Sequence, residues 1–109
     1  MQIIQSLEEF TAAIENNRAV LAYFSTESCS VCHVLKPKLE QMIALEFPQI
    51  KLLYIPSDQL PEVAAQNRIF TAPTVLVFFE GKESIRKSRA FGIEQLKAEI
   101  QRPYSIAFN

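Results

Sequence analysis

The chain has 109 residues, 49% of them hydrophobic, which is enough for one domain with a single core over residues 1–109. Eleven Lys and Arg residues stand against twelve Asp and Glu residues, so the net charge is −1, and no block of five or six like charges occurs. This balance argues against nucleic acid as a partner. No stretch approaches the ~20 apolar residues of a membrane helix, and the first residues do not resemble a signal peptide. We therefore expect no membrane partner, a cytoplasmic location and, by default, a monomer.

The first part of the chain predicts a strand, a helix and a second strand. Residues 1–5 fit a short first strand. Ser6 followed by Glu9 is a capping box, which marks the start of a helix that ends near Asn17. The continuous apolar run 19–24 then fits a strand that is buried on both faces.

Two cysteines follow this strand where a long helix begins. Apolar residues recur at helical spacing through residues 30–46, which places Cys29 near the first turn and Cys32 one turn deeper. The free N–H groups at a helix start stabilise an anion, so Cys29 favours the thiolate form. An exposed thiolate with a second thiol within reach is the minimum equipment for thiol–disulfide exchange.

The second half predicts a strand over 50–55, a short helix capped by Asp58 or a neighbour, and a strongly apolar strand over 75–79. A turn at residues 80–82 then predicts an antiparallel hairpin with a strand over 83–90. That last strand contains the basic cluster 86–89, which fits a charged sheet edge better than a nucleic-acid site.

The chain predicts a final amphipathic helix that starts after Phe91 and Gly92 and is ended by Pro103. The short tail 103–109 is apolar enough to dock and short enough to fray, and both readings stay open. Strands alternating with helices, followed by a hairpin, indicate an α/β fold. We expect a central mixed sheet of four or five strands flanked by helices on both faces, with five strands if residues 1–5 pair.

This order of elements and motifs resembles the thioredoxin family over roughly residues 1–102. The Cys-x-x-Cys pair alone would be weak support, but its combination with a proline in the following helix and with Ala-Pro before an apolar strand is specific. The residues that carry the resemblance are Cys29, Cys32, Pro37, Ala72, Pro73, Gly81 and Gly92. The resemblance implies a thioredoxin fold.

The resemblance also implies the reaction of a protein-disulfide reductase. Cys29 would attack a substrate disulfide and Cys32 would resolve the mixed disulfide. The family's active-site proline is cis, although general preference favours a trans Ala72–Pro73 bond, and the backbone of Ala72 would pair with an extended substrate strand. The implied substrate-binding residues are Ser28, Ser30, Val31, Ala72, Pro73, Phe91 and Gly92.

The implied partners are proteins that contain disulfides and an electron-donating reductase such as a thioredoxin reductase. Such a protein would contribute to cell redox homeostasis. A single dedicated partner, such as one oxidised enzyme, is also compatible with the sequence. No cofactor and no metal are expected.

His33 completes the sequence Cys-x-x-Cys-His, which is also the attachment motif of c-type haem. Haem attachment needs export in most systems and a second axial ligand, and a structural zinc site needs a second pair of ligands. The chain has no further Cys or His. We therefore expect His33 to be a solvated helix residue that favours the Cys29 thiolate.

Several residues depart from the family pattern. Ser28 replaces the usual Trp, and Ser30 and Val31 replace the usual Gly-Pro between the cysteines. Tyr23 stands where the family has a buried acid, and Tyr54 where it has a lysine. These departures favour an alternative, a non-catalytic or redox-sensing interaction module with a thioredoxin fold, or a reductase that works slowly.

Overall fold

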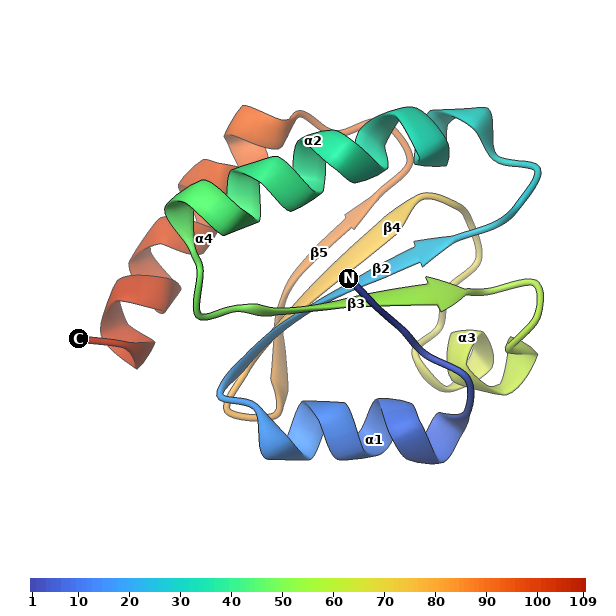
Figure 1. The fold of residues 1–109 in the computed structure, drawn as a ribbon, viewed down its shortest axis with the longest axis horizontal. Coiled ribbons are helices and arrows are strands. Elements are labelled where there is room, and N and C mark those ends of the chain that lie inside the picture. The colour runs from blue at the N-terminus through green and yellow to red at the C-terminus, as the bar shows by residue number, and fades with distance from the viewer.

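Five strands in the order β1-β3-β2-β4-β5 form a mixed sheet between two layers of helices in the computed structural model, which describes residues 1–109 (Figure 1). Helices α1 and α3 cover one face, and α2 and α4 cover the other, as expected for the predicted fold class. In chain order the elements are β1 (Gln2–Ile3), α1 (Leu7–Asn16), β2 (Ala19–Ser25), α2 (Ser30–Glu46), β3 (Lys51–Pro56), α3 (Pro61–Gln66), β4 (Thr74–Phe79), β5 (Lys82–Ser88) and α4 (Ile93–Ala107).

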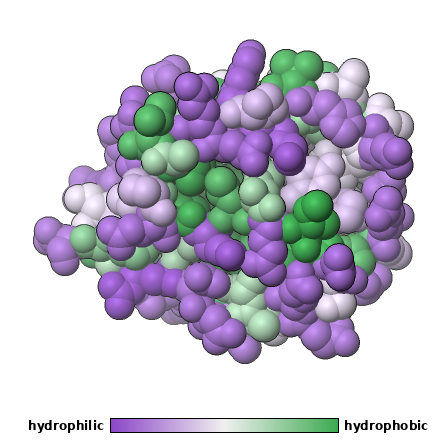
Figure 2. Space-filling view, viewed as in Figure 1, coloured by the Kyte–Doolittle hydropathy of each residue, from purple (hydrophilic) through white to green (hydrophobic).

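The central strand β2 lies parallel to β3 and antiparallel to β4. All seven of its residues are buried, which confirms the expectation from the continuous apolar run. The short strand β1 pairs in parallel with β3 through Gln2 and Leu53, so the sheet has five strands. Figure 2 shows a mostly hydrophilic surface in which hydrophobic residues gather between α1 and α2.

Local signals in the sequence fix the starts of several elements. The Ser6 hydroxyl accepts a hydrogen bond from the Glu9 N–H at 3.1 Å, which confirms the predicted helix cap. Glu80 and Gly81 both have positive φ, 53° and 80°, and they connect β4 to β5 as a two-residue hairpin loop. The basic cluster 86–89 begins in β5, an edge strand, as expected.

The prediction that Pro103 ends the last helix is wrong, because α4 continues through Pro103 to Ala107. Proline removes one N–H bond, but the following turn is held by packing. The Tyr104 ring lies 4.9 Å from the Phe47 ring and 4.8 Å from the Phe108 ring. The tail therefore docks on the core, because its aromatic side chains bury surface there.

The expected cap of the short third helix is also different. Leu60 occupies the N-cap position of α3 without a side-chain hydrogen bond, and Pro61 takes the first helical position. Proline suits that position because its φ is already helical and the N–H is not needed. Asp58 is exposed and caps nothing.

Alternate residues of the strands point to opposite faces of the sheet and form two separate hydrophobic cores. Leu21 and Tyr23 face α2 and α4, together with Cys32, whereas Val20 and Phe24 face α1 and α3. No helix of the structure combines the length and the apolar character that crossing a bilayer requires.

Candidate active site

Two loops leave adjacent strands at the same end of the sheet. Phe24 of β2 pairs with Thr74 of β4, so the loop after β2 and the loop before β4 emerge side by side. The first loop carries Cys29 and the second carries Ala72, and both residues pack against the same core cluster. The fold therefore brings together the two motifs that the sequence analysis singled out, although 43 positions separate Cys29 from Ala72.

A disulfide joins Cys29 and Cys32, whose Cα atoms lie 5.3 Å apart. Cys29 is the N-cap of α2, and its Sγ accepts a hydrogen bond from the Cys32 N–H at 3.2 Å. Cys29 is half-buried and Cys32 is fully buried, as the helical spacing predicts. After reduction, the same N–H and the helix start would stabilise negative charge on the Cys29 sulfur.

The Ala72–Pro73 peptide bond is cis. Pro73 is buried and Ala72 is half-buried. The main-chain N–H and C=O of Ala72 take part in none of the hydrogen bonds within the protein, whereas the Pro73 carbonyl accepts from the Arg89 N–H at 2.8 Å. Ala72 thus offers a free donor and a free acceptor to an extended chain.

Tyr23 lies beneath the disulfide and is fully buried. Its hydroxyl donates to the Cys32 carbonyl at 2.7 Å, and its ring centroid is 6.1 Å from that of Tyr54. Burial, followed by the neighbouring Tyr54, raises the pKa of Tyr23 to about 12. Tyr23 is therefore neutral at physiological pH and supplies no anionic base to Cys32.

Ser25 is a member of the site that the sequence analysis missed. It is fully buried at the end of β2, and its Oγ accepts a hydrogen bond from the Tyr54 hydroxyl at 3.1 Å. The Lys36 Nζ lies over the Tyr54 ring, 5.6 Å from its centre, which is a cation–π contact. The sequence did contain a signal for Ser25, since it is the one polar residue at the end of an apolar strand, just before the cysteine loop.

His33 is exposed on α2, as expected. Its Nε2 lies 2.9 Å from the Glu27 carbonyl oxygen, and because a carbonyl only accepts, Nε2 carries the hydrogen. The side chain thereby ties the cysteine loop to the helix. Within the whole chain no group of three or more His, Cys, Asp and Glu side chains converges on a point that could hold a metal ion.

The other predicted binding residues surround the cysteines to different degrees. Ser28 and Ser30 are exposed, and Val31 is 60% exposed beside Val34 at the rim of a shallow hollow. Phe91 is half-buried on the core cluster that Cys29 also contacts. Gly92 is the N-cap of α4, and no hydrogen bond joins it to the cysteine loop.

Comparison with known proteins agrees with the fold and the motif. The sequence model of the family described as Thioredoxin matches residues 2–102. The chain is similar to the thioredoxin-like protein YdfQ of Bacillus subtilis, with 36% identity over 93% of this chain and 87% of that protein. It is also 30% identical to thioredoxin-1 of Saccharomyces cerevisiae, over 72% of this chain and 76% of the yeast protein.

Solved structures give the same result at the level of the fold. A Plasmodium falciparum thioredoxin matches with a TM-score of 0.83 and 22% identity, covering 94% of this chain and 99% of that one. A Fasciola hepatica thioredoxin matches with a TM-score of 0.81 and 25% identity, covering 93% and 98%. With its Cys-x-x-Cys pair at the start of α2, the chain belongs to the thioredoxin family of thiol–disulfide oxidoreductases.

Proposed function

We propose that the protein reduces disulfides of other proteins and is itself re-reduced by an electron-donating reductase such as a thioredoxin reductase. In this proposal it works in the cytoplasm and contributes to redox homeostasis. One observation carries it. Cys29 is half-buried, its sulfur accepts a hydrogen bond from the Cys32 N–H at a helix start, and it lies at the same end of the sheet as the unpaired main chain of Ala72.

The proposed reaction proceeds through one mixed disulfide. The Cys29 thiolate attacks a substrate sulfur, the substrate disulfide breaks, a bond from Cys29 to the substrate forms, and the released thiolate takes a proton from solvent. The Cys32 thiol then loses its proton to solvent and attacks the Cys29 sulfur. The second substrate thiolate leaves and is protonated. Two electrons have passed to the substrate, and the Cys29–Cys32 bond stores the oxidised state.

The free main chain of Ala72 would hold the substrate during this exchange. Hydrogen bonds from main-chain groups tolerate many sequences, which suits a catalyst with several substrates. Ser28, Ser30 and Val31 would line the entrance to the cysteines because all three are exposed there.

The second step is expected to be slow compared with a site that has a buried carboxylate at position 23. Tyr23 is neutral, and its hydroxyl already donates to the Cys32 carbonyl. The proton of Cys32 must therefore leave to water or to groups of the cysteine loop.

Reduction of insulin with a dithiol donor tests the proposal. The wild type should accelerate the reaction and Cys29→Ser should abolish the acceleration, while Thr11→Ala on the exposed side of α1 should match the wild type. Cys32→Ser should accumulate a mixed disulfide that is visible on a non-reducing gel. A wild type as inert as Cys29→Ser would contradict the proposal and favour an interaction module.

A further inference from the structure

Phe70 is exposed close to the proposed docking residue. Its side chain is 88% exposed, more than any other large hydrophobic side chain of the protein, and it lies two positions before Ala72. Exposed hydrophobic side chains are common singly, but an aromatic ring at the edge of a binding site is typical of contact surfaces. We define the Phe70 patch as Phe70 together with Arg68 and Arg89.

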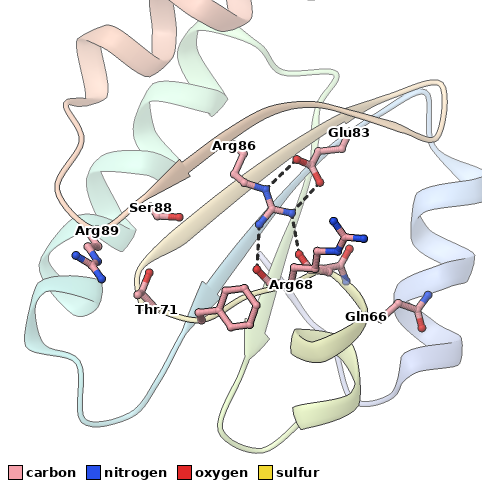
Figure 3. Close-up of a pocket in the computed structure, with 9 residues that line it drawn as sticks. Gln66, Arg68, Thr71, Glu83, Arg86, Ser88 and Arg89 are labelled. Carbon is pink, nitrogen blue, oxygen red and sulfur yellow. Dashed lines mark hydrogen bonds and ion pairs between the residues drawn. The ribbon is translucent and has the colours of Figure 1, made fainter.

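A hollow of about 770 Å³ lies beside Phe70, and its charged lining is mostly basic (Figure 3). Arg68, Arg86 and Arg89 face it, with Glu83 as the single acidic residue. Three positive charges against one negative charge leave an excess of two. The chain as a whole has a net charge of −1, so this excess is a local property.

Arg86 is already engaged and shapes the hollow. It forms a two-pronged ion pair with Glu83, with both N···O distances at 2.9 Å, and it also donates to the carbonyls of Asn67 at 2.7 Å and Arg68 at 3.2 Å (Figure 3). The ion pair lowers the pKa of Glu83, chiefly through its hydrogen bond with Arg86. Arg86 therefore ties β5 to the end of α3.

Arg68 and Arg89 are exposed and neither forms an ion pair. Their main chains are fixed, since Arg86 holds the Arg68 carbonyl and the Arg89 N–H donates to the Pro73 carbonyl at 2.8 Å. Arg68 and Arg89 thus present two guanidinium groups without an ion pair from hydrogen-bonded backbone beside the hollow, and the Arg68 charge also helps to lower the pKa of Glu83.

The other side of Phe70 has a different character. A second hollow of about 450 Å³ contains apolar residues of α3, and Asp58 is its only charged residue. Phe70 borders both hollows. A bound chain would therefore meet positive charge on one side of the ring and negative charge on the other.

We propose that the Phe70 patch selects protein partners whose segment beside the reacting disulfide carries an apolar side chain followed by acidic residues. The apolar side chain contacts Phe70, and the carboxylates lie against Arg68 and Arg89. Main-chain pairing at Ala72 accepts any sequence, so the patch supplies the preference through charge complementarity. This inference rests on the proposed function and names the partner class for it.

Two synthetic peptides test the preference. Each consists of two short chains joined by one disulfide, with a fluorophore on one chain and a quencher on the other. A leucine stands beside the cysteine, followed by two glutamates in one peptide and two lysines in the other. Pre-reduced protein is mixed with each peptide in a single turnover, and the gain in fluorescence gives the rate constant for exchange.

The wild type should reduce the acidic peptide about tenfold faster than the basic one, because each exposed ion pair contributes modestly and both pairs act together. At about 1 M salt the ratio should fall toward one, since charges are then screened within a few ångströms. Phe70→Ala should lower both rates and keep the ratio.

The variant Arg68→Glu/Arg89→Glu should reverse the preference. Its matched control is Lys51→Glu/Arg102→Glu, which changes the net charge equally at exposed positions away from the patch and should keep the wild-type ratio. If the patch variant does not fold, the single changes Arg68→Gln and Arg89→Gln should each lower the ratio by about threefold.

Two failures are distinguishable. An active protein that reduces both peptides at equal rates, or a control variant that shifts the ratio as much as the patch variant, would overturn the patch and leave the reductase proposal standing. A wild type inert toward both peptides and toward insulin would overturn the proposed function and this inference with it.

Discussion

The two faces of the sheet are built from the same strands but hold different interiors. The face under α1 and α3 has an apolar centre, where the Phe10 ring lies 6.2 Å from the rings of both Phe24 and Phe78; buried Thr74 lies at its edge and donates to the Thr71 carbonyl. The face under α2 and α4 includes Tyr23 and Cys32, with a hydrogen bond between them. Both faces are fully buried at the centre of β2.

The face under α1 and α3 thus serves mainly stability, whereas the face under α2 and α4 also supports the redox-active cysteines. Aromatic packing on the α1 and α3 face gains free energy without any polar group to satisfy. The α2 and α4 face accepts buried hydroxyl groups, each of which needs a partner. The polar groups lie beneath the disulfide, so the face that carries the redox pair is also the one with the more demanding interior.

The largest expected effect is on the apolar face. Phe24→Ala should lower the free energy of unfolding by about 3 to 5 kcal/mol, because it removes a fully buried ring and leaves a cavity. Phe70→Ala is the matched control, with an expected change within about 0.5 kcal/mol because its ring is exposed. Denaturant unfolding measures both. A loss below about 1 kcal/mol for Phe24→Ala would remove the contrast between the faces.

The next effect is a pH dependence on the polar face. The pKa of Tyr23 is raised from 10.0 to about 12 in the folded protein. Below pH 10 the hydroxyl is protonated in both states; between pH 10 and 12 only the unfolded state loses the proton, so stability falls as the pH rises. The total loss is about 2 to 3 kcal/mol, from about 1.4 kcal/mol for each pH unit.

Tyr23→Phe isolates that dependence. At pH 8 the variant should be less stable than the wild type by about 1 kcal/mol, because the Cys32 carbonyl loses its hydrogen bond. By pH 11.5 the order should reverse, since the variant has no group to ionise there. Unfolding curves recorded for both proteins from pH 8 to 11.5 measure this, and parallel pH profiles would contradict the burial argument.

A smaller effect is expected from the hydrogen bond between the Tyr54 hydroxyl and Ser25, which lies on the same face of the sheet. Ser25→Ala should cost about 1 kcal/mol, because the Tyr54 hydroxyl loses its acceptor. In a double-mutant cycle with Tyr54→Phe, the two changes should be less than additive. Additive losses would show that the hydroxyl pair does not interact.

The smallest expected effect comes from the Lys36 ammonium group above the Tyr54 ring. Lys36→Met keeps the length of the side chain and removes both the charge above the Tyr54 ring and the ion pair with Glu40 at 3.9 Å, so a loss of about 0.5 kcal/mol is expected. Lys38→Met, an exposed neighbour for which no aromatic contact is found, should change nothing measurable. Thermal unfolding of both variants gives the comparison, and equal values would mean that the cation adds nothing.

The local features of the site, the helix start at the cysteines and the buried strand before it, could be predicted from the sequence. The cysteine at the start of α2 follows from the apolar periodicity of residues 30–46, and the buried strand β2 follows from its continuous apolar run. The end of α4 was not readable, because Pro103 favours a break locally and packing of Tyr104 and Phe108 outweighs it. The cis geometry of Pro73 was indicated by the family resemblance alone, since proline bonds by themselves favour trans.

The sequence by itself determined the order of the elements and the placement of Cys29 at a helix start, because these depend on neighbours within a few turns. It also indicated the family, because the order of the motifs along the chain can be seen without the structure. Only the tertiary structure decided that Tyr23 bonds the Cys32 carbonyl and that Arg68 and Arg89 line the same hollow as Phe70. The first contact joins β2 to α2, whereas the pairing of β4 with β5 brings Arg89 back beside Pro73 and the hollow. The turn at residues 80–82 indicated the hairpin locally, but which side chains of other elements meet there depends on the packing of the whole chain.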